Sequence, residues 1–210
     1  MSRIDELIEQ LCPDGVEYKE LRELGTVTRG SYLQKKHFVD AGVPCIHYGQ
    51  IYTRYGLHAT ETISFVSEET AAKSRMAHPG DVVMAVTSEN IEDVCKCVTW
   101  LGDCDVAISG HTAIIHHDQN PRYMTYYFHS SSFDVWKRKL AHGTKVIEVT
   151  PDKLLDVRVP IPPMEIQQEI VRVLDSFAEL EAELEAELEA RRRQYAYYRD
   201  KLLAFQERTA

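Results

Sequence analysis

The last 47 residues of the chain, 164–210, contain neither glycine nor proline. Apolar residues recur there mostly three or four positions apart, which places them along one face of a helix. The pattern predicts one long helix that pairs with another as a coiled coil. At about 1.5 Å per residue the helix would extend about 60 Å to residue 205. A single helix of this kind cannot bury its own stripe of apolar residues. We expect the pairing contacts at Ile170, Phe177, Leu180, Leu184, Leu188, Tyr195 and Leu202.

A proline cluster, Val159-Pro160-Ile161-Pro162-Pro163, precedes this helix. Proline lacks an N–H and fixes φ, so no helix can run through the cluster, whereas its last proline suits the first turn of the next helix. We therefore expect a domain at 1–160 and the long helix at 161–210.

Hydrophobic patterning within 1–158 predicts a mixture of helices and strands. We expect helices at 4–11, 67–76, 120–130 and 132–141, with Ser67 and Asn120 as N-caps and Pro121 in the first turn. Runs of apolar and β-branched residues predict strands at 42–47, 81–86, 95–101, 106–109, 112–116, 145–149 and 157–161. The expected fold class is α+β, with a mixed α/β domain followed by one long C-terminal coiled-coil helix.

The formal net charge of −9 argues at first against a nucleic-acid or membrane-binding protein. The charge is unevenly distributed, however. Residues 24–60 carry four basic residues and one acid, residues 119–147 carry five and one, and the remainder therefore carries −16. The first stretch is also rich in tyrosine. Together the two stretches predict a basic, aromatic surface of the kind that contacts phosphates and reads bases.

The cellular compartment is predicted from two features of the sequence. No apolar run approaches the roughly 20 residues that span a bilayer. The N-terminus carries acids where a secretory signal needs a basic and then an apolar stretch. We expect a cytoplasmic protein without a membrane span, whose five cysteines are free thiols.

Polar and basic segments within the two stretches, and at nearby strand ends, are the candidate DNA contacts. Gly143-Thr144-Lys145 offers a backbone N–H, a hydroxyl and a charge to one phosphate. Segments 87–90 and 109–112 follow strands and could read base edges. Alternatively, the tyrosines belong partly to the core, and the basic residues of 137–139 only form the solvated face of a helix. The candidate contacts are Tyr32, Lys35, Lys36, Tyr52, Arg54, Thr87, Ser88, Asn90, Ser109, His111, Thr112, Lys137, Lys139, Gly143, Thr144 and Lys145.

Catalytic and metal chemistry find little support in the sequence. No glycine-rich loop ends in Gly-Lys-Ser/Thr. Asp14, Glu17 and Lys19 match the order of a metal-dependent nuclease, but they are too close together in one turn. Cys95 and Cys97, with Cys104 and the histidines at 111, 116 and 117, fit no common zinc spacing. We predict neither a catalytic nor a metal site.

Four segments resemble the specificity subunits of type I restriction-modification systems. They are Leu11-Cys12-Pro13-Asp14-Gly15-Val16-Glu17-Tyr18, Gly80-Asp81-Val82-Val83, Ser109-Gly110-His111, and the segment from Val159 to Ile170. The last is the most specific, and the match in order extends over essentially the whole chain. The resemblance implies a non-catalytic, DNA-reading subunit without a cofactor. It implies methyltransferase (modification) partner subunits that bind S-adenosylmethionine, and restriction subunits that use ATP and Mg²⁺.

Family members typically contain two target recognition domains and two helical regions, whereas this chain has one of each. The resemblance therefore suggests an antiparallel homodimer that reads an interrupted palindrome in double-stranded DNA, with half-sites about 34 Å apart. Two alternatives remain open: a coiled-coil adaptor whose α/β domain binds protein, and the detached specificity half of a fused restriction-methyltransferase.

Overall fold

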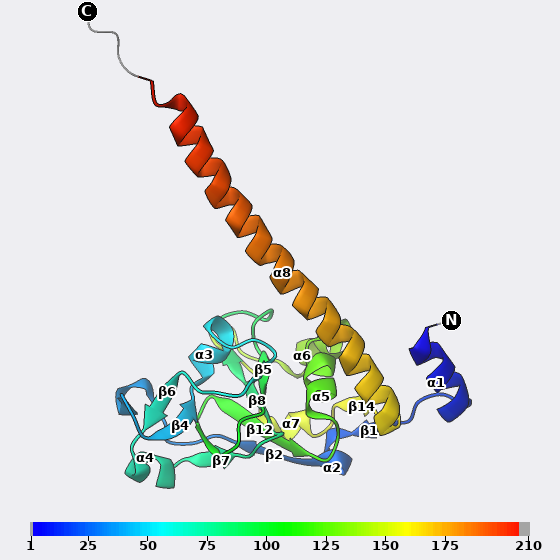
Figure 1. Ribbon diagram of the computed structural model, residues 1–210. Helices are drawn as coiled ribbons and strands as arrows, with labels where there is room; N and C mark the ends of the chain where they lie inside the picture. Colours follow the sequence, from blue (N-terminus) through cyan, green and yellow to red (C-terminus); the bar gives the residue numbers. More distant parts are fainter. Residues whose placement is uncertain (1, 206–210) are drawn as a thin grey trace, which may run out of the picture. The chain divides into compact units, whose positions relative to one another are not determined.

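The computed structural model describes residues 2–205, and its contacts divide them into two units (Figure 1). The first unit ends at Gln168, and the second starts at Glu169. The first is a mixed α/β domain, and the second consists of most of the long C-terminal helix. The expected α+β fold class is confirmed.

The two ends of the first unit are joined by a small antiparallel ladder. Helix α1 (Arg3–Leu11) begins with a capping box, in which the Ser2 hydroxyl accepts from the Asp5 N–H and the Asp5 carboxylate accepts from the Ser2 N–H. Strand β1 (Tyr18–Glu20) then pairs with β14 (Arg158–Pro160), the strand that leads into the proline cluster. Helix α2 (Leu21–Leu24) follows β1.

Two five-stranded sheets form the centre of the domain. The first has the order β2-β12-β8-β10-β5, and the second has the order β3-β6-β4-β11-β7. Neighbouring strands are antiparallel except for the β10–β5 and β11–β4 pairs, which are parallel. The strands of the first sheet are β2 (Gly25–Arg29), β12 (Thr112–His117), β8 (Val82–Ala85), β10 (Cys97–Trp100) and β5 (His58–Ala59). Those of the second are β3 (Phe38–Val39), β6 (Ser64–Val66), β4 (Val43–Ile46), β11 (Val106–Ile108) and β7 (Arg75–Ala77).

The core lies among the central strands of both sheets. Every residue of β8, β10 and β11 is buried, so these strands are covered on both faces. Val83, Val98 and Trp100 of the first sheet pack in one cluster with Ile46 and Ile108 of the second. Burying each such side chain contributes about 1.5–3 kcal/mol. All seven predicted strands occur, most of them shorter than expected.

The helices of the domain agree in part with the sequence. Helices α5 (Pro121–Phe128) and α6 (Ser131–Leu140) lie where expected, and the Asn120 side chain caps α5. Helix α4 (Glu68–Ala72) has the expected Ser67 cap but is shorter than 67–76, because β7 begins at Arg75 and pairs with β11. The elements that were not predicted include η1 (Lys35–His37), α3 (Tyr48–Thr53), α7 (Pro151–Leu154) and the two-residue strand β9 (Thr87–Ser88), which pairs with β13 (Ile147–Glu148).

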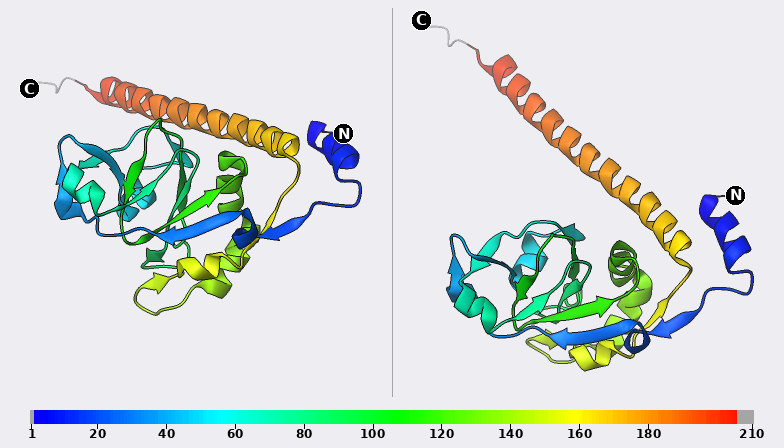
Figure 2. Two further views of the ribbon diagram at one scale, coloured as in Figure 1. Left: turned by 90° about the horizontal axis from the view of Figure 1, so that it is seen from below. Right: turned by 60° about the horizontal axis from the view of Figure 1, so that its bottom comes forward.

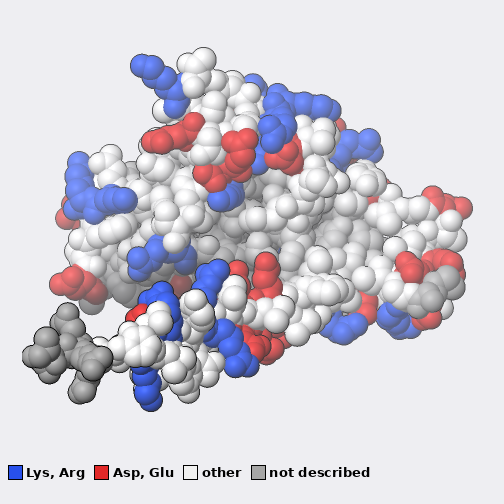
Figure 3. Space-filling view, turned by 90° about the horizontal axis from the view of Figure 1, so that it is seen from above, with Lys and Arg blue, Asp and Glu red and all other residues white. Residues whose placement is uncertain are grey.

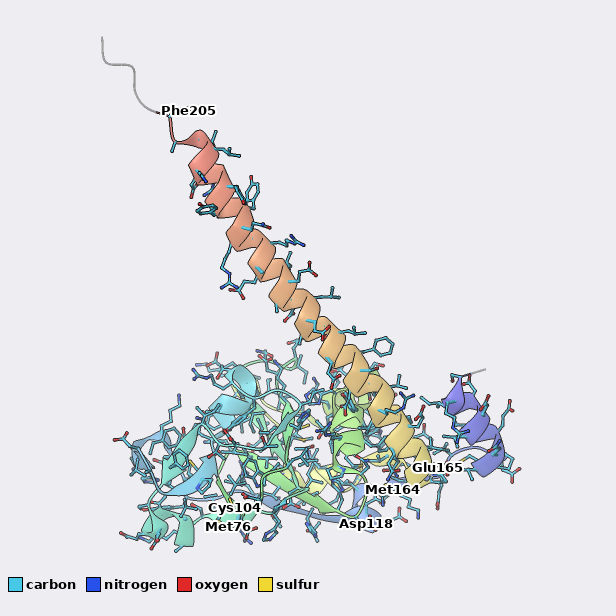
Figure 4. All side chains as sticks on the ribbon, in the orientation of Figure 1. Met76, Cys104, Asp118, Met164, Glu165 and Phe205 are labelled. Atoms are coloured by element: carbon cyan, nitrogen blue, oxygen red, sulfur yellow. The ribbon has the colours of Figure 1, made fainter. Side chains whose placement is uncertain are left out.

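Helix α8 (Met164–Leu203) is 40 residues long and unbroken (Figure 2). Met164 and Glu165 lie at its start, and Phe205 lies beyond its other end (Figure 4). Its predicted pairing residues are exposed, apart from Ile170, which is partly buried. The exposed fractions are 63% for Phe177, 53% for Leu180, 66% for Leu184, 51% for Leu188 and 69% for both Tyr195 and Leu202. Within residues 2–205, no helix is long and apolar enough to cross a membrane.

Candidate nucleic-acid interface

Four segments of the first unit meet around a cavity of about 400 Å³, which we call the polar cavity. Helix α3, strand β9 with the loop after it, the β11–β12 turn and the loop before β13 contribute to it. It brings together five of the predicted contacts, Tyr52, Thr87, Ser88, Asn90 and His111. Its other lining residues are Tyr48, Glu89, Asp93 and Val146.

Helix α3 is held at its start by the buried side chain of His47. The His47 Nδ1 atom accepts from the Gly49 N–H (3.2 Å), and Gln50 Oε1 accepts from the His47 N–H (3.1 Å). Burial, together with the nearby charges of Lys35 and then His111, lowers the pKa of His47 to about 4. The ring is therefore neutral at pH 7 and can accept a hydrogen bond at Nδ1.

Tyr52 ties α3 to strand β9. Its hydroxyl donates to the Thr87 carbonyl (2.6 Å), and burial raises the pKa of this phenol well above its ordinary value, so it stays protonated. Thr87 itself is buried. These two predicted contacts therefore position the cavity wall, whereas the next residue, Ser88, is half-buried and lines the cavity.

The loop after β9 is fixed by its own polar side chains. Asn90 Oδ1 accepts from the Asp93 N–H (2.8 Å), and Asn90 Nδ2 donates to Asp93 Oδ2 (2.8 Å). The Lys96 ammonium pairs with the other oxygen of Asp93 (2.6 Å). The carboxylate of exposed Glu89 has no hydrogen bond or ion pair with another residue of 2–205.

The β11–β12 turn buries two predicted contacts and exposes a third. Ser109 Oγ accepts from the Tyr48 N–H (2.9 Å), and Thr112 Oγ1 donates to the Ser109 carbonyl (2.6 Å). Both side chains are buried. His111 between them is exposed, and its ring centroid lies 4.9 Å from that of Tyr48. Ser109 and Thr112 therefore shape the turn that presents His111.

The remaining predicted contacts lie outside the lining of the polar cavity. Lys35 and Lys36 are exposed on η1, and Arg54 is exposed at the end of α3. Tyr32, at φ 52° and half-exposed, stacks on His37 with ring centroids 4.9 Å apart. Figure 3 shows Lys and Arg interspersed with Asp and Glu on the visible face, without one continuous basic patch among the described residues.

The two lysines predicted on α6 lie in different environments. The Lys137 side chain is only 11% exposed, and its ammonium donates to the Glu92 carbonyl (3.1 Å) and pairs with Asp134 (2.9 Å). Lys139 is exposed and lies over the Trp136 ring, 5.4 Å from its centroid. Lys137 thus anchors the loop after β9 and is nearly buried.

The turn at 143–145 presents its polar groups to solvent. Gly143 has φ 106°, and a Cβ atom at this position would collide with the Val146 carbonyl oxygen. Only glycine fits such a turn without strain. Thr144 and Lys145 are exposed, and backbone hydrogen bonds between His142 and Glu148 close the loop.

The cysteines and histidines form no metal site among residues 2–205, since no group of three or more potential ligands is close enough to hold an ion. All five cysteines are free, and burial raises the pKa of both Cys45 and Cys95 to about 12.

Comparison with known proteins gives one family. The family described as the type I restriction modification DNA specificity domain matches residues 13–190. The specificity subunit of the type I restriction enzyme MjaVIII from Methanocaldococcus jannaschii is 25% identical to this chain over 175 residues. These residues are 80% of this chain and 40% of that protein.

Solved structures show the same fold. A chain from a study of complex assembly and conformational transition of the type I R-M system matches with a TM-score of 0.63 and 22% identity, over 94% of this chain and 50% of that one. The HsdS subunit from Thermoanaerobacter tengcongensis matches with a TM-score of 0.58 and 20% identity, over 87% and 44% respectively. The chain thus spans at most half the length of these relatives.

Proposed function

The chain belongs to the type I restriction-modification DNA specificity family, which is non-catalytic and holds no cofactor, and we propose that it reads one half of a bipartite DNA target. The proposal rests on the residues that line the polar cavity. Exposed His111 and Glu89 line it together with Tyr48. The hydrogen bonds of Ser109 and Asn90 fix the β11–β12 turn and the loop after β9, which present these groups. Polar groups of this kind read base edges, while exposed lysines such as Lys36 and Lys145 contact phosphates.

Selection of duplexes from a randomised library by the chain, with its methyltransferase partner, tests this function. We expect one motif to be enriched and its affinity to fall steeply as salt rises, because neutralised phosphates release counterions. The alternative that the acidic composition favours is a protein-binding adaptor. An adaptor would enrich no motif from the library and would bind no duplex in preference to another.

The exposed stripe of α8 supports pairing with a second copy of the chain. Phe177, Leu180, Leu184 and Leu188 line one shallow groove on the helix. The distribution of charge along α8 favours an antiparallel orientation of the pair. Residues 164–190 carry nine acids and one basic residue, whereas residues 191–203 carry five basic residues and one acid. An antiparallel pair in full register places the basic residues 191–203 of each helix beside residues 164–176 of the other, which carry three acids and one basic residue, and a parallel pair places the two basic parts together. The acidic run 179–189 lies beside its own copy in either orientation, so the charge difference comes from the helix ends.

Two-fold symmetry of such a homodimer makes the two half-sites identical, so the proposed target is an interrupted palindrome. Sedimentation equilibrium at micromolar concentration should give a dimer. A stable monomer would contradict the pairing. Mapping of methylated motifs in cells that carry the chain should give two inverted copies of one half-site, and two unrelated half-sites would contradict the symmetry.

We further propose that the chain acts in the cytoplasm as the platform for two kinds of partner. Methyltransferase subunits would supply S-adenosylmethionine chemistry, and restriction subunits would supply ATP- and Mg²⁺-dependent cleavage. Co-purification of methyltransferase activity with a tagged chain tests the first partner.

A further inference from the structure

Glu89 differs from the other carboxylate of the polar cavity. Asp93 is bonded to Asn90 and paired with Lys96. Glu89 is exposed, and among residues 2–205 it has neither a hydrogen bond nor an ion pair. A carboxylate of this kind has its full capacity to accept hydrogen bonds from a ligand.

A carboxylate on a DNA-reading surface is selective because of its charge. Phosphates repel it, and so do the acceptor groups of bases, namely guanine O6 and N7 and thymine O4. The major groove offers it only two kinds of donor, the N4 amino group of cytosine and the N6 amino group of adenine. Glu89 therefore favours one of these two bases and rejects the others.

Cytosine fits the carboxylate better than adenine does. Adenine presents its N7 acceptor beside the N6 donor, a pattern that suits the amide of Asn or Gln. The nearby amide, Asn90, already uses both its oxygen and its nitrogen on Asp93. Cytosine presents a donor without an acceptor on its own edge, which matches a group that only accepts.

The backbone on both sides of Glu89 is fixed before DNA binds. The β9–β13 ladder and the Tyr52 hydroxyl hold Thr87. The Asn90–Asp93 hydrogen bonds hold the residues that follow. Only the rotamers of the Glu89 side chain remain to be ordered on binding, which keeps the entropic cost low.

On the proposed function, we infer that Glu89 accepts a hydrogen bond from the N4 amino group of one cytosine in each half-site and so determines specificity at that base pair. Glu92 provides a matched control. It is an exposed glutamate on the same loop, and it does not line the polar cavity.

Duplex selection from a randomised library, with the chain and its methyltransferase partner, tests the inference in wild type, Glu89→Gln and Glu92→Gln. Wild type should select cytosine at one position of the half-site. Glu89→Gln should reduce the preference for cytosine there by about 5- to 150-fold and leave the other positions unchanged, because glutamine also donates to guanine and thymine acceptors. Glu92→Gln should retain the wild-type motif. Both variants should bind random duplexes slightly more tightly, since each loses one negative charge.

Three results would overturn the assignment. The first is a Glu89→Gln protein with an unchanged melting temperature that selects the wild-type motif with undiminished preference, a result that leaves the proposed function standing. The second is a lost preference for adenine in place of cytosine, which removes the cytosine assignment. The third is a wild type that enriches no motif, in which case DNA reading fails and the role of Glu89 fails with it.

Discussion

Lys137 and Lys145 were both candidate phosphate contacts, and the structure places them in opposite environments. The Lys137 ammonium is bonded to the Glu92 carbonyl and to Asp134, and its side chain is 11% exposed. Lys145 is exposed on the turn after Gly143. The same substitution to alanine should therefore affect folding stability at one position and DNA affinity at the other.

The loss of folding stability in Lys137→Ala can be estimated from the two partners that lose the ammonium group. A hydrogen bond from a charged donor contributes about 1.5–3 kcal/mol, and the Glu92 carbonyl loses it. Asp134 keeps its ion pair with Arg138 (2.7 Å), so that carboxylate is not left alone. The free energy of unfolding should fall by about 1.5–3 kcal/mol, which for a unit of this size lowers the melting temperature by about 3–12 °C.

Thermal melts and binding titrations across a series of salt concentrations separate the two effects. Lys145→Ala should leave the melting temperature unchanged, weaken binding to all duplexes alike, and reduce the slope of log affinity against log salt by about 1. Lys137→Ala should lower the melting temperature without changing that slope. If Lys137→Ala reduces the slope as much as Lys145→Ala does, and melts like wild type, Lys137 reaches the phosphates and the anchoring role is wrong.

Three further predictions concern helix α8, the surface of the first unit and the buried ring of His47. Leu184→Lys places a charge in the stripe of α8 and should convert the dimer to a monomer in sedimentation equilibrium. Lys36→Ala should weaken cognate and random duplexes equally, whereas His111→Ala should reduce the ratio between them in competition titrations. The folded-state pKa of His47, about 4 because of burial, lies below the ordinary 6.5, so stability should decrease as pH falls from about 6.5 to about 4. His47→Asn keeps an acceptor for the Gly49 N–H and should flatten this loss in urea melts at a series of pH values.

The features that the sequence predicted well are those that depend on neighbouring residues. The three prolines between Val159 and Met164 exclude a helix whatever the rest of the chain does, and the regular apolar spacing after them predicts α8. Asn120 before Pro121 is a local start signal, and α5 begins there. Buried strands such as β8 consist of continuous apolar runs, so their positions were also predictable.

The features that were missed depend on contacts between distant residues. Helix α3 has only six residues, too few for a periodic pattern, and its first N–H groups are bonded to His47 and to Ser109, which is 61 positions from Tyr48. One missed feature did leave a signal. Phe133 and Lys137 are four residues apart on α6, so they share a face, and the burial of one indicates burial of the other. No comparable signal distinguishes Glu89 from Asn90, because their roles depend on the fold of the loop.

If phosphates are contacted outside the polar cavity and bases inside it, as proposed, an acidic chain can still discriminate between DNA sequences. A net charge of −9 opposes binding to every duplex by a similar amount, and it therefore lowers affinity without lowering preference. The exposed lysines outside the cavity, such as Lys36 and Lys145, would offset part of this repulsion for every duplex alike. On the proposed function, preference arises inside the cavity, whose lining includes the Glu89 carboxylate and the His111 imidazole. Added phosphate contacts, such as those a methyltransferase partner would bring, should therefore raise the affinity of the complex and leave the ratio between cognate and random duplexes determined by this chain.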